Sequence, residues 1–202
     1  MENIKIPLIV LTLAMLMQQA DGQNFRPRPF VNKRLMELSV GFTGGIHVFE
    51  PVQSMYLNGA FAYCMENQIA VRADYFLFIP DPNFRGQLDR NSSLLAGGEF
   101  HFPHGRLDLS LLLQPGVAFC FLEVPGSLQR TRAEPIVRLG AETTYYLLNN
   151  AHVFVNASYL RGNYYLEGSE PYRLDELRIT AGLGIQIFVN HTPVFQRKVV
   201  KF

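Results

Sequence analysis

Residues 177–185 read Leu177-Arg178-Ile179-Thr180-Ala181-Gly182-Leu183-Gly184-Ile185, in which apolar residues alternate with small, hydroxyl or charged ones. Residues 36–43 follow the same rule, and six further stretches between these two repeat it. Successive side chains of a β-strand point to opposite faces, so each stretch has one apolar face and one polar face. We therefore predict eight strands that share a continuous apolar face.

The connections between these strands alternate in length. The predicted strands lie at about 35–49, 54–64, 68–78, 93–102, 106–121, 135–147, 152–164 and 177–188. Tight turns follow the second, fourth and sixth strands at 66–67, 103–105 and 149–150, and longer loops span 50–53, 79–92, 122–134 and 165–176. Short turns at one end of the strands and long loops at the other are typical of membrane barrels. We predict an all-β fold, an eight-stranded antiparallel up-and-down transmembrane β-barrel.

Outward-facing aromatic residues gather near both ends of the predicted strands. Beside the short turns lie Tyr63, Phe100, Phe102 and Tyr145. Toward the long loops lie Phe49, Tyr75, Phe119, Phe121 and Tyr159. Two such rings match the interfacial girdles of a membrane barrel, whereas the core of a soluble β-sandwich would concentrate its aromatic residues in mid-strand.

An export signal precedes the strands. Lys5 is followed by an apolar run over 6–17, and Ala20-Asp21-Gly22 supplies the small residues that a signal peptidase reads. We predict a signal peptide over 1–22, an exposed periplasmic lead-in over 23–34, the barrel over 35–188 and a C-terminal tail over 189–202. A retained membrane anchor is the alternative, although the run is short for a bilayer span.

Charge is sparse on the strands. The formal net charge of +1 indicates neither a nucleic acid nor an acidic partner. No lysine occurs between Lys33 and Lys198, although soluble β-proteins place lysine on exposed strand faces and edges. An apolar face in lipid requires closure, because each unpaired backbone group at an open edge would cost several kcal/mol.

The interior of an eight-stranded barrel is filled by side chains. The predicted inward positions combine small residues with charged ones. We predict an interior charge network of Glu37, Arg72, Asp74, Glu99, Arg138, Glu142 and Arg178, joined by His101 and Asp108. Because acids and bases are both present, the first interpretation is a plug of ion pairs. A proton or ion path and a catalytic constellation are the alternatives.

The two cysteines are predicted to be free thiols. Cys64 ends a strand beside a short turn, whereas Cys120 lies toward a long loop. Strand rise places them about 30 Å apart. A disulfide requires Cα atoms within about 7 Å.

Residues 35–188 resemble the eight-stranded outer-membrane β-barrel family that includes OmpX and the transmembrane domain of OmpA. The resemblance rests on the export signal, the alternating stretches, the sorted connections and the final strand Ile185-Gln186-Ile187-Phe188. It implies location in the cell outer membrane, contact with its lipid and insertion by the barrel-assembly machinery, and we expect a monomer. That machinery reads a terminal aromatic residue, for which Phe188 and Phe202 are both candidates.

Two small barrel enzymes act on lipid A, so catalysis is an alternative. The His-x-Ser pattern of the deacylase is absent at His101, His104 and His152. His47, near the outer rim, could be the base of an acyltransferase-like set with Asp81 and Ser92, but the first interpretation of His47 is an interior polar residue. No spacing of cysteine and histidine indicates a metal site, and no cofactor is predicted.

The long loops are the predicted working surface. Arg85 and Arg90 in 81–90, and Arg130 and Arg132 in 125–132, are candidates to contact phosphate groups of surface glycolipid. Three functions remain open: a non-enzymatic outer-membrane protein with a structural or surface-contact role, a lipid A-modifying enzyme, and a secreted soluble β-barrel that binds a small apolar ligand. The third would place the leucines of 107–113 inside.

Overall fold

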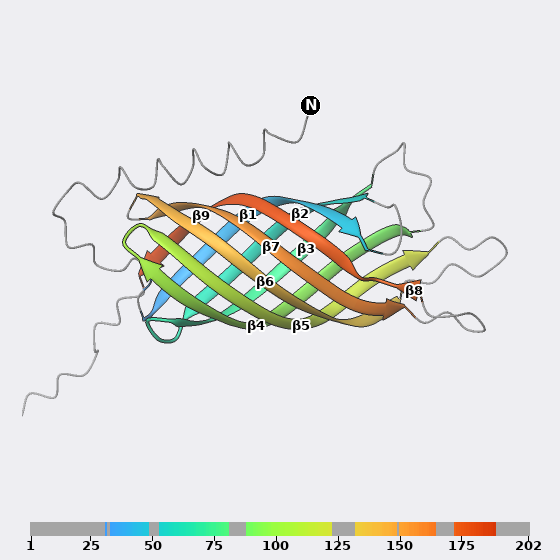
Figure 1. Cartoon of the computed structure of the whole chain (residues 1–202), viewed down its shortest axis with the longest axis horizontal. Coiled ribbons are helices and arrows are strands. Elements are labelled where there is room, and N and C mark those ends of the chain that lie inside the picture. The colour runs from blue at the N-terminus through green and yellow to red at the C-terminus, as the bar shows by residue number, and fades with distance from the viewer. Residues whose placement is uncertain are drawn as a thin grey trace, which may run out of the picture.

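The computed structural model describes residues 31, 33–48, 53–80, 88–122, 132–148, 150–164 and 172–188, and these residues form a closed β-barrel (Figure 1). Its strands are β1 (Leu35–His47), β2 (Gln53–Cys64), β3 (Ile69–Ile79), β4 (Leu88–His104), β5 (Leu107–Leu122), β6 (Arg132–Leu148), β7 (Ala151–Tyr164), β8 (Tyr172–Arg173) and β9 (Glu176–Phe188). The two residues of β8 pair with the end of β7. In this part of the chain, no helix is long and apolar enough to cross a membrane.

The first and last long strands close the barrel. Every long strand runs antiparallel to its neighbours, and the strands follow one another around the barrel in chain order. The β1–β9 pairing extends from Leu35 opposite Phe188 to His47 opposite Glu176, and β9 also pairs with β7. The eight long strands therefore leave no open sheet edge, which is the condition for a sheet in lipid.

Side chains alternate strictly between the inside and the outside of the wall. On β9, Ile179 and Leu183 are 54% and 62% exposed, whereas Thr180 between them is 1% exposed. Leu109 and Leu113 on β5 are likewise exposed. A soluble barrel would bury these leucines, so the soluble alternative is wrong. An apolar surface that encircles the molecule indicates lipid as its solvent.

The aromatic belts lie on this outer surface. Exposed rings near the turn end are Tyr63, Phe100 and Phe102, with Tyr145 half-buried, and those near the loop end are Tyr75, Phe119 and Tyr159. Phe49 and the side chain of Phe121 lie outside the described part of the structure. The two belts mark the levels at which the wall leaves the hydrocarbon.

Several strand ends differ from the sequence prediction. β4 begins at Leu88 rather than Ser93, and β6 begins at Arg132 rather than Pro135, because β5 is long enough to pair with both extensions. β1 ends at His47 rather than at residue 49. The short strand β8 falls within the predicted loop 165–176.

Val31 corrects the prediction that the whole segment 23–34 is exposed. Its side chain is fully buried in the turn end of the barrel. Arg34 has a φ of 71°, a left-handed conformation that turns the chain, and its N–H donates to the carbonyl oxygen of Cys64 at 2.8 Å. Val31 is thereby directed into a cluster with Leu35, Cys64, Ala70 and Tyr146.

The prediction of two free thiols is confirmed. Cys64 is buried in the cluster around Val31 at the turn end. Cys120 is buried in a separate cluster with Tyr56 and Phe76 at the loop end.

Gly97 on β4 marks a close approach to β5. The pairing of β4 with β5 stops after Leu95 and Gly116 and resumes at Gly98 and Leu113. The gap lies beside Pro115 of β5, a residue that lacks an N–H. A Cβ atom on Gly97 would strike the backbone of Leu113 and Gln114. A Cβ atom on Gly98, the next residue, would meet nothing within 4 Å.

We therefore expect Gly97→Val to lower the free energy of unfolding by about 1–3 kcal/mol, the usual cost of overpacking. Gly98→Val is the matched control, because it adds the same side chain to the outer face of the same strand. Its expected effect is within about 0.5 kcal/mol. Urea-dependent unfolding in lipid vesicles measures both, and equal effects would contradict the assignment of the two faces.

Candidate functional site in the barrel interior

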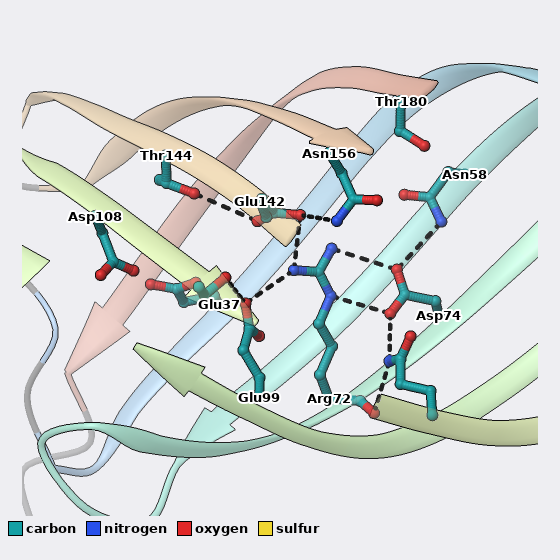
Figure 2. A network of polar contacts seen from close by, with 12 residues as sticks. Glu37, Asn58, Arg72, Asp74, Glu99, Asp108, Glu142, Thr144, Asn156 and Thr180 are labelled. Carbon is teal, nitrogen blue, oxygen red and sulfur yellow. Dashed lines mark hydrogen bonds and ion pairs between the residues drawn. The ribbon is translucent and has the colours of Figure 1, made fainter. Parts of the chain in front are cut away.

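Arg72 on β3 is the centre of the interior polar network (Figure 2). Its Nε atom lies 3.0 Å from Asp74 Oδ2 on the same strand. Its Nη1 atom lies 2.9 Å from Glu142 Oε2 on β6 and 3.4 Å from Glu99 Oε1 on β4. A guanidinium presents its N–H donors in a fixed fork, so one buried side chain connects three strands.

Arg138 on β6 extends the network toward the loop end. Its Nη1 atom donates to Gln114 Oε1 at 2.9 Å, and its Nη2 atom donates to Asn156 Oδ1 at 2.7 Å. Gln114 in turn donates from Nε2 to Asp74 Oδ2 at 2.7 Å. Arg138 Nη1 also lies 3.4 Å from Asp74 Oδ1. Asp74 is therefore held between two arginines and an amide.

A third arginine, Arg178 on β9, lies nearer the long loops. Its Nε atom donates to Glu176 Oε2 at 2.8 Å, and its Nη1 atom donates to Ser93 Oγ at 3.0 Å. Its guanidinium lies 4.3 Å from the centre of the Tyr56 ring, whose hydroxyl donates to Glu176 at 2.9 Å. The cation is thus neutralised by a carboxylate and covered by an aromatic face.

The turn-end half of the network is rich in carboxylates. His101 Nδ1 lies 2.6 Å from Asp108 Oδ2, and His101 Nε2 lies 3.8 Å from Glu99 Oε2. Ser110 Oγ donates to Glu99 Oε1 at 2.6 Å, and the Tyr146 hydroxyl donates to Glu37 at 3.3 Å. Figure 2 shows Glu37 and Asp108 on the side of Glu99 away from Asp74. Arginine alone therefore does not balance the acids of this half.

An apolar cluster lies near each end of the network. At the loop end the cluster contains Tyr56, Phe76, Leu95, Ala118, Cys120, Ile136, Leu160 and Leu174. At the turn end it contains Val31, Leu35, Cys64, Ala70 and Tyr146. Leu174 and Val31 come from outside the long strands, and both are fully buried. The interior is therefore filled by a polar network with an apolar cluster near each end, and at the loop end polar side chains such as Asn91, Glu176 and Arg178 pack among the cluster.

All seven residues proposed for the interior network line the inner wall. Two of the four arginines assigned to loops do not lie in loops: Arg90 lies in β4 opposite Phe121, and Arg132 lies in β6 opposite Cys120. The longer strands explain this correction. Arg85 and Arg130 lie outside the described residues.

Sequence reasoning missed the uncharged members of the network. Tyr56, Gln114, Asn156 and Thr180 are all at most 1% exposed, and each makes a side-chain hydrogen bond inside the barrel. Strand alternation was a sufficient signal, because each of these residues occupies an inward position. The charge-based search passed over them.

His47 lies in the barrel interior, and its partners among the described residues do not include Ser92. Its Nε2 atom lies 3.2 Å from Ser54 Oγ and 3.9 Å from Glu176 Oε1. A nucleophilic triad places the hydroxyl and the carboxylate on different ring nitrogens, whereas here both approach the same one. Ser92 Oγ instead accepts a hydrogen bond from the Phe78 N–H, and Asp81 lies outside the described residues. Within the described ranges, no group of histidine, cysteine and carboxylate side chains has the arrangement of a metal site.

Three solved outer-membrane proteins have the same fold. Ail of Yersinia pestis aligns with a TM-score of 0.52 at 16% identity, over 77% of this chain and 99% of its own. Neisserial surface protein A aligns at 0.55 and 10% identity, over 77% and 96%. OprG of Pseudomonas aeruginosa aligns at 0.57 and 10% identity, over 80% and 100%. Ail has also been solved with the heparin analogue sucrose octasulfate, and that structure aligns at 0.51.

Neither family models nor curated protein sequences match this chain. The structural alignments, at these identities, establish the fold. The encircling apolar surface, the two aromatic belts and the absence of an open edge among the long strands establish the solvent of that fold. The chain therefore has the fold of eight-stranded outer-membrane β-barrels, with its apolar outer wall toward lipid.

Proposed function

We propose that this protein is a non-enzymatic barrel that works through its long loops, which contact anionic surface glycolipid, and that its interior is structural. The arrangement of the interior carries this proposal. A path for ions or a substrate needs an open route, whereas the charged side chains of the interior are almost fully buried and bound to one another, and apolar side chains pack near both ends. The remaining surface outside the lipid belongs to the connecting segments.

The composition of the long loops supports an anionic partner. Arg85 lies in the segment between β3 and β4, and Arg130 lies in the segment between β5 and β6. Guanidinium groups bind phosphate and sulfate through paired hydrogen bonds. The complex of Ail with a heparin analogue is a precedent for an anionic sugar on a barrel of this fold. The proposal includes export by the 1–22 signal, insertion by the barrel-assembly machinery and a monomeric state.

The loop assignment predicts that Arg130→Gln weakens the binding of sucrose octasulfate. Hydrogen bonds to charged groups contribute about 1.5–3 kcal/mol, so we expect at least a tenfold loss of affinity. Calorimetry on the full chain in phosphatidylcholine nanodiscs measures it. Arg106→Gln, in the turn between β4 and β5 at the opposite end, is the charge-matched control and should bind as the parent does.

Equal losses in Arg130→Gln and Arg106→Gln, or no binding by the parent, would contradict the loop assignment. The enzyme alternative has its own readout. Lipid A from cells that produce the protein should keep its mass spectrum. A change in acyl chains that disappears in His47→Ala would replace our proposal with a lipid-modifying activity.

The structural role of the interior predicts a large effect of Arg72→Met. This change leaves Asp74, Glu99 and Glu142 without their shared cation, and breaking a buried pair typically costs about 3–5 kcal/mol. The double variant Arg72→Met/Glu142→Gln removes one orphaned carboxylate and should recover part of the loss. Denaturant unfolding in vesicles gives both values, and an Arg72→Met effect below about 1 kcal/mol would refute the role.

A further inference from the structure

Two arginines interrupt the uncharged outer wall, and both lie at one place on the rim. Among the side chains that the structure describes, the outward positions of the eight long strands carry one acidic, lysine or arginine residue, Arg161 on β7. The second arginine, Arg173, is on β8, which pairs with the end of β7. Both lie toward the long loops, at the end of the barrel where β8 is drawn in Figure 1.

The height of Arg161 on the wall corresponds to the headgroup region of a membrane. Tyr159, two residues earlier on the same face of β7, is 39% exposed and belongs to the loop-end aromatic belt. Interfacial tyrosines lie at the boundary between hydrocarbon and headgroups. Two residues add about 7 Å along the strand, and because barrel strands are tilted this raises Arg161 by about 5 Å toward the loops. A long arginine side chain at that position extends its guanidinium among lipid phosphates.

The pairing of β7 with β8 brings the two arginines close together. Asn163 lies opposite Arg173, and Arg161 is two residues from Asn163 on the same face. Diagonal neighbours of this kind are about 7–8 Å apart between their backbones, which long side chains easily span. Asn163 is exposed between them and offers an amide donor.

Arg173 is held in place while part of its side chain remains outside. Its Nη2 atom lies 3.2 Å from Asp175 Oδ2, and its side chain is 49% exposed, whereas that of Asp175 is 1% exposed. The intervening Leu174 is fully buried, and its N–H donates to the Gly162 carbonyl at 2.9 Å. Arg161, Arg173 and Asp175 together carry one net positive charge, which matches the single negative charge of a phosphate diester.

The residues beside this cluster indicate the source of the phosphate. Val137 lies opposite Arg161 and is 48% exposed, and Leu177 lies opposite Tyr159 and is 45% exposed. A phosphate that carries acyl chains would place the chains against these residues and its charge at the arginines. We propose that Arg161, Asn163 and Arg173 form a binding site on the barrel wall for the phosphate of an anionic lipid headgroup.

The site lies on strands, so it depends on the outer-membrane placement but not on the loop contacts proposed above. Native mass spectrometry of the full chain, titrated with phosphatidylglycerol in detergent, counts retained lipids. We expect Arg161→Gln to weaken retention about fivefold, the effect of about 1 kcal/mol for one cation near headgroups. Arg161→Lys should retain more lipid than Arg161→Gln, and the sucrose octasulfate affinity should be unchanged.

Arg106→Gln, which removes one exposed arginine at the turn end, should retain lipid as the parent does. Unchanged circular dichroism and heat-dependent gel migration establish that each variant is folded. Equal retention in Arg161→Gln and Arg106→Gln would overturn the site. Equal retention of phosphatidylglycerol and zwitterionic phosphatidylcholine would also overturn the site, because the headgroup charge would then have no role. Displacement of the lipid by inorganic phosphate alone would overturn it as well, because the site would then bind free phosphate and not a lipid.

Discussion

Hydrocarbon offers no hydrogen-bond partner to a peptide group, and this constraint underlies the whole structure. The β1–β9 pairing meets it by joining the two ends of the chain's sheet along the full length of both strands. Once the sheet is closed, alternation assigns every residue to lipid or to the interior. The positions of the belts, the turns and the rim arginines all follow from that one closure.

Closure around eight strands also determines what the interior can contain. The space is narrow, so glycine is required where strands approach, as at Gly97, and the remaining volume is filled by side chains. Charged groups are tolerated there because they contact one another: Arg72 is shared by three carboxylates, and Asp74 is shared by two arginines. The charged side chains of this network are almost fully buried.

Much of the fold was predictable from the sequence because a period of two residues is unambiguous over eight stretches. The strand ends were less predictable. Residues 88–92 and 132–134 lack clean alternation, and their pairing is imposed by the length of β5. Val31 follows a proline-rich segment with no periodicity, so its burial depends on the left-handed turn at Arg34.

The interior network shows the same division. Alternation identified which charged residues face inward, but not which of them meet. Arg72 and Glu142 are on strands that are not neighbours, β3 and β6, and only the curvature of the closed wall brings them within 2.9 Å. Uncharged partners such as Gln114 and Asn156 carry no signal in a search for charge. The rim pair Arg161 and Arg173 depends on β8, which no sequence pattern indicated.

Lipid, and not water, surrounds the outer wall of the barrel. Spin labels placed singly at Leu38, Val71, Leu109 and Ile185, in the full chain in bilayers, test it most directly. Electron paramagnetic resonance should show that all four labels are accessible to oxygen dissolved in lipid and shielded from a water-soluble nickel chelate. Access of the nickel chelate to all four positions would mean that water, and not lipid, surrounds the wall.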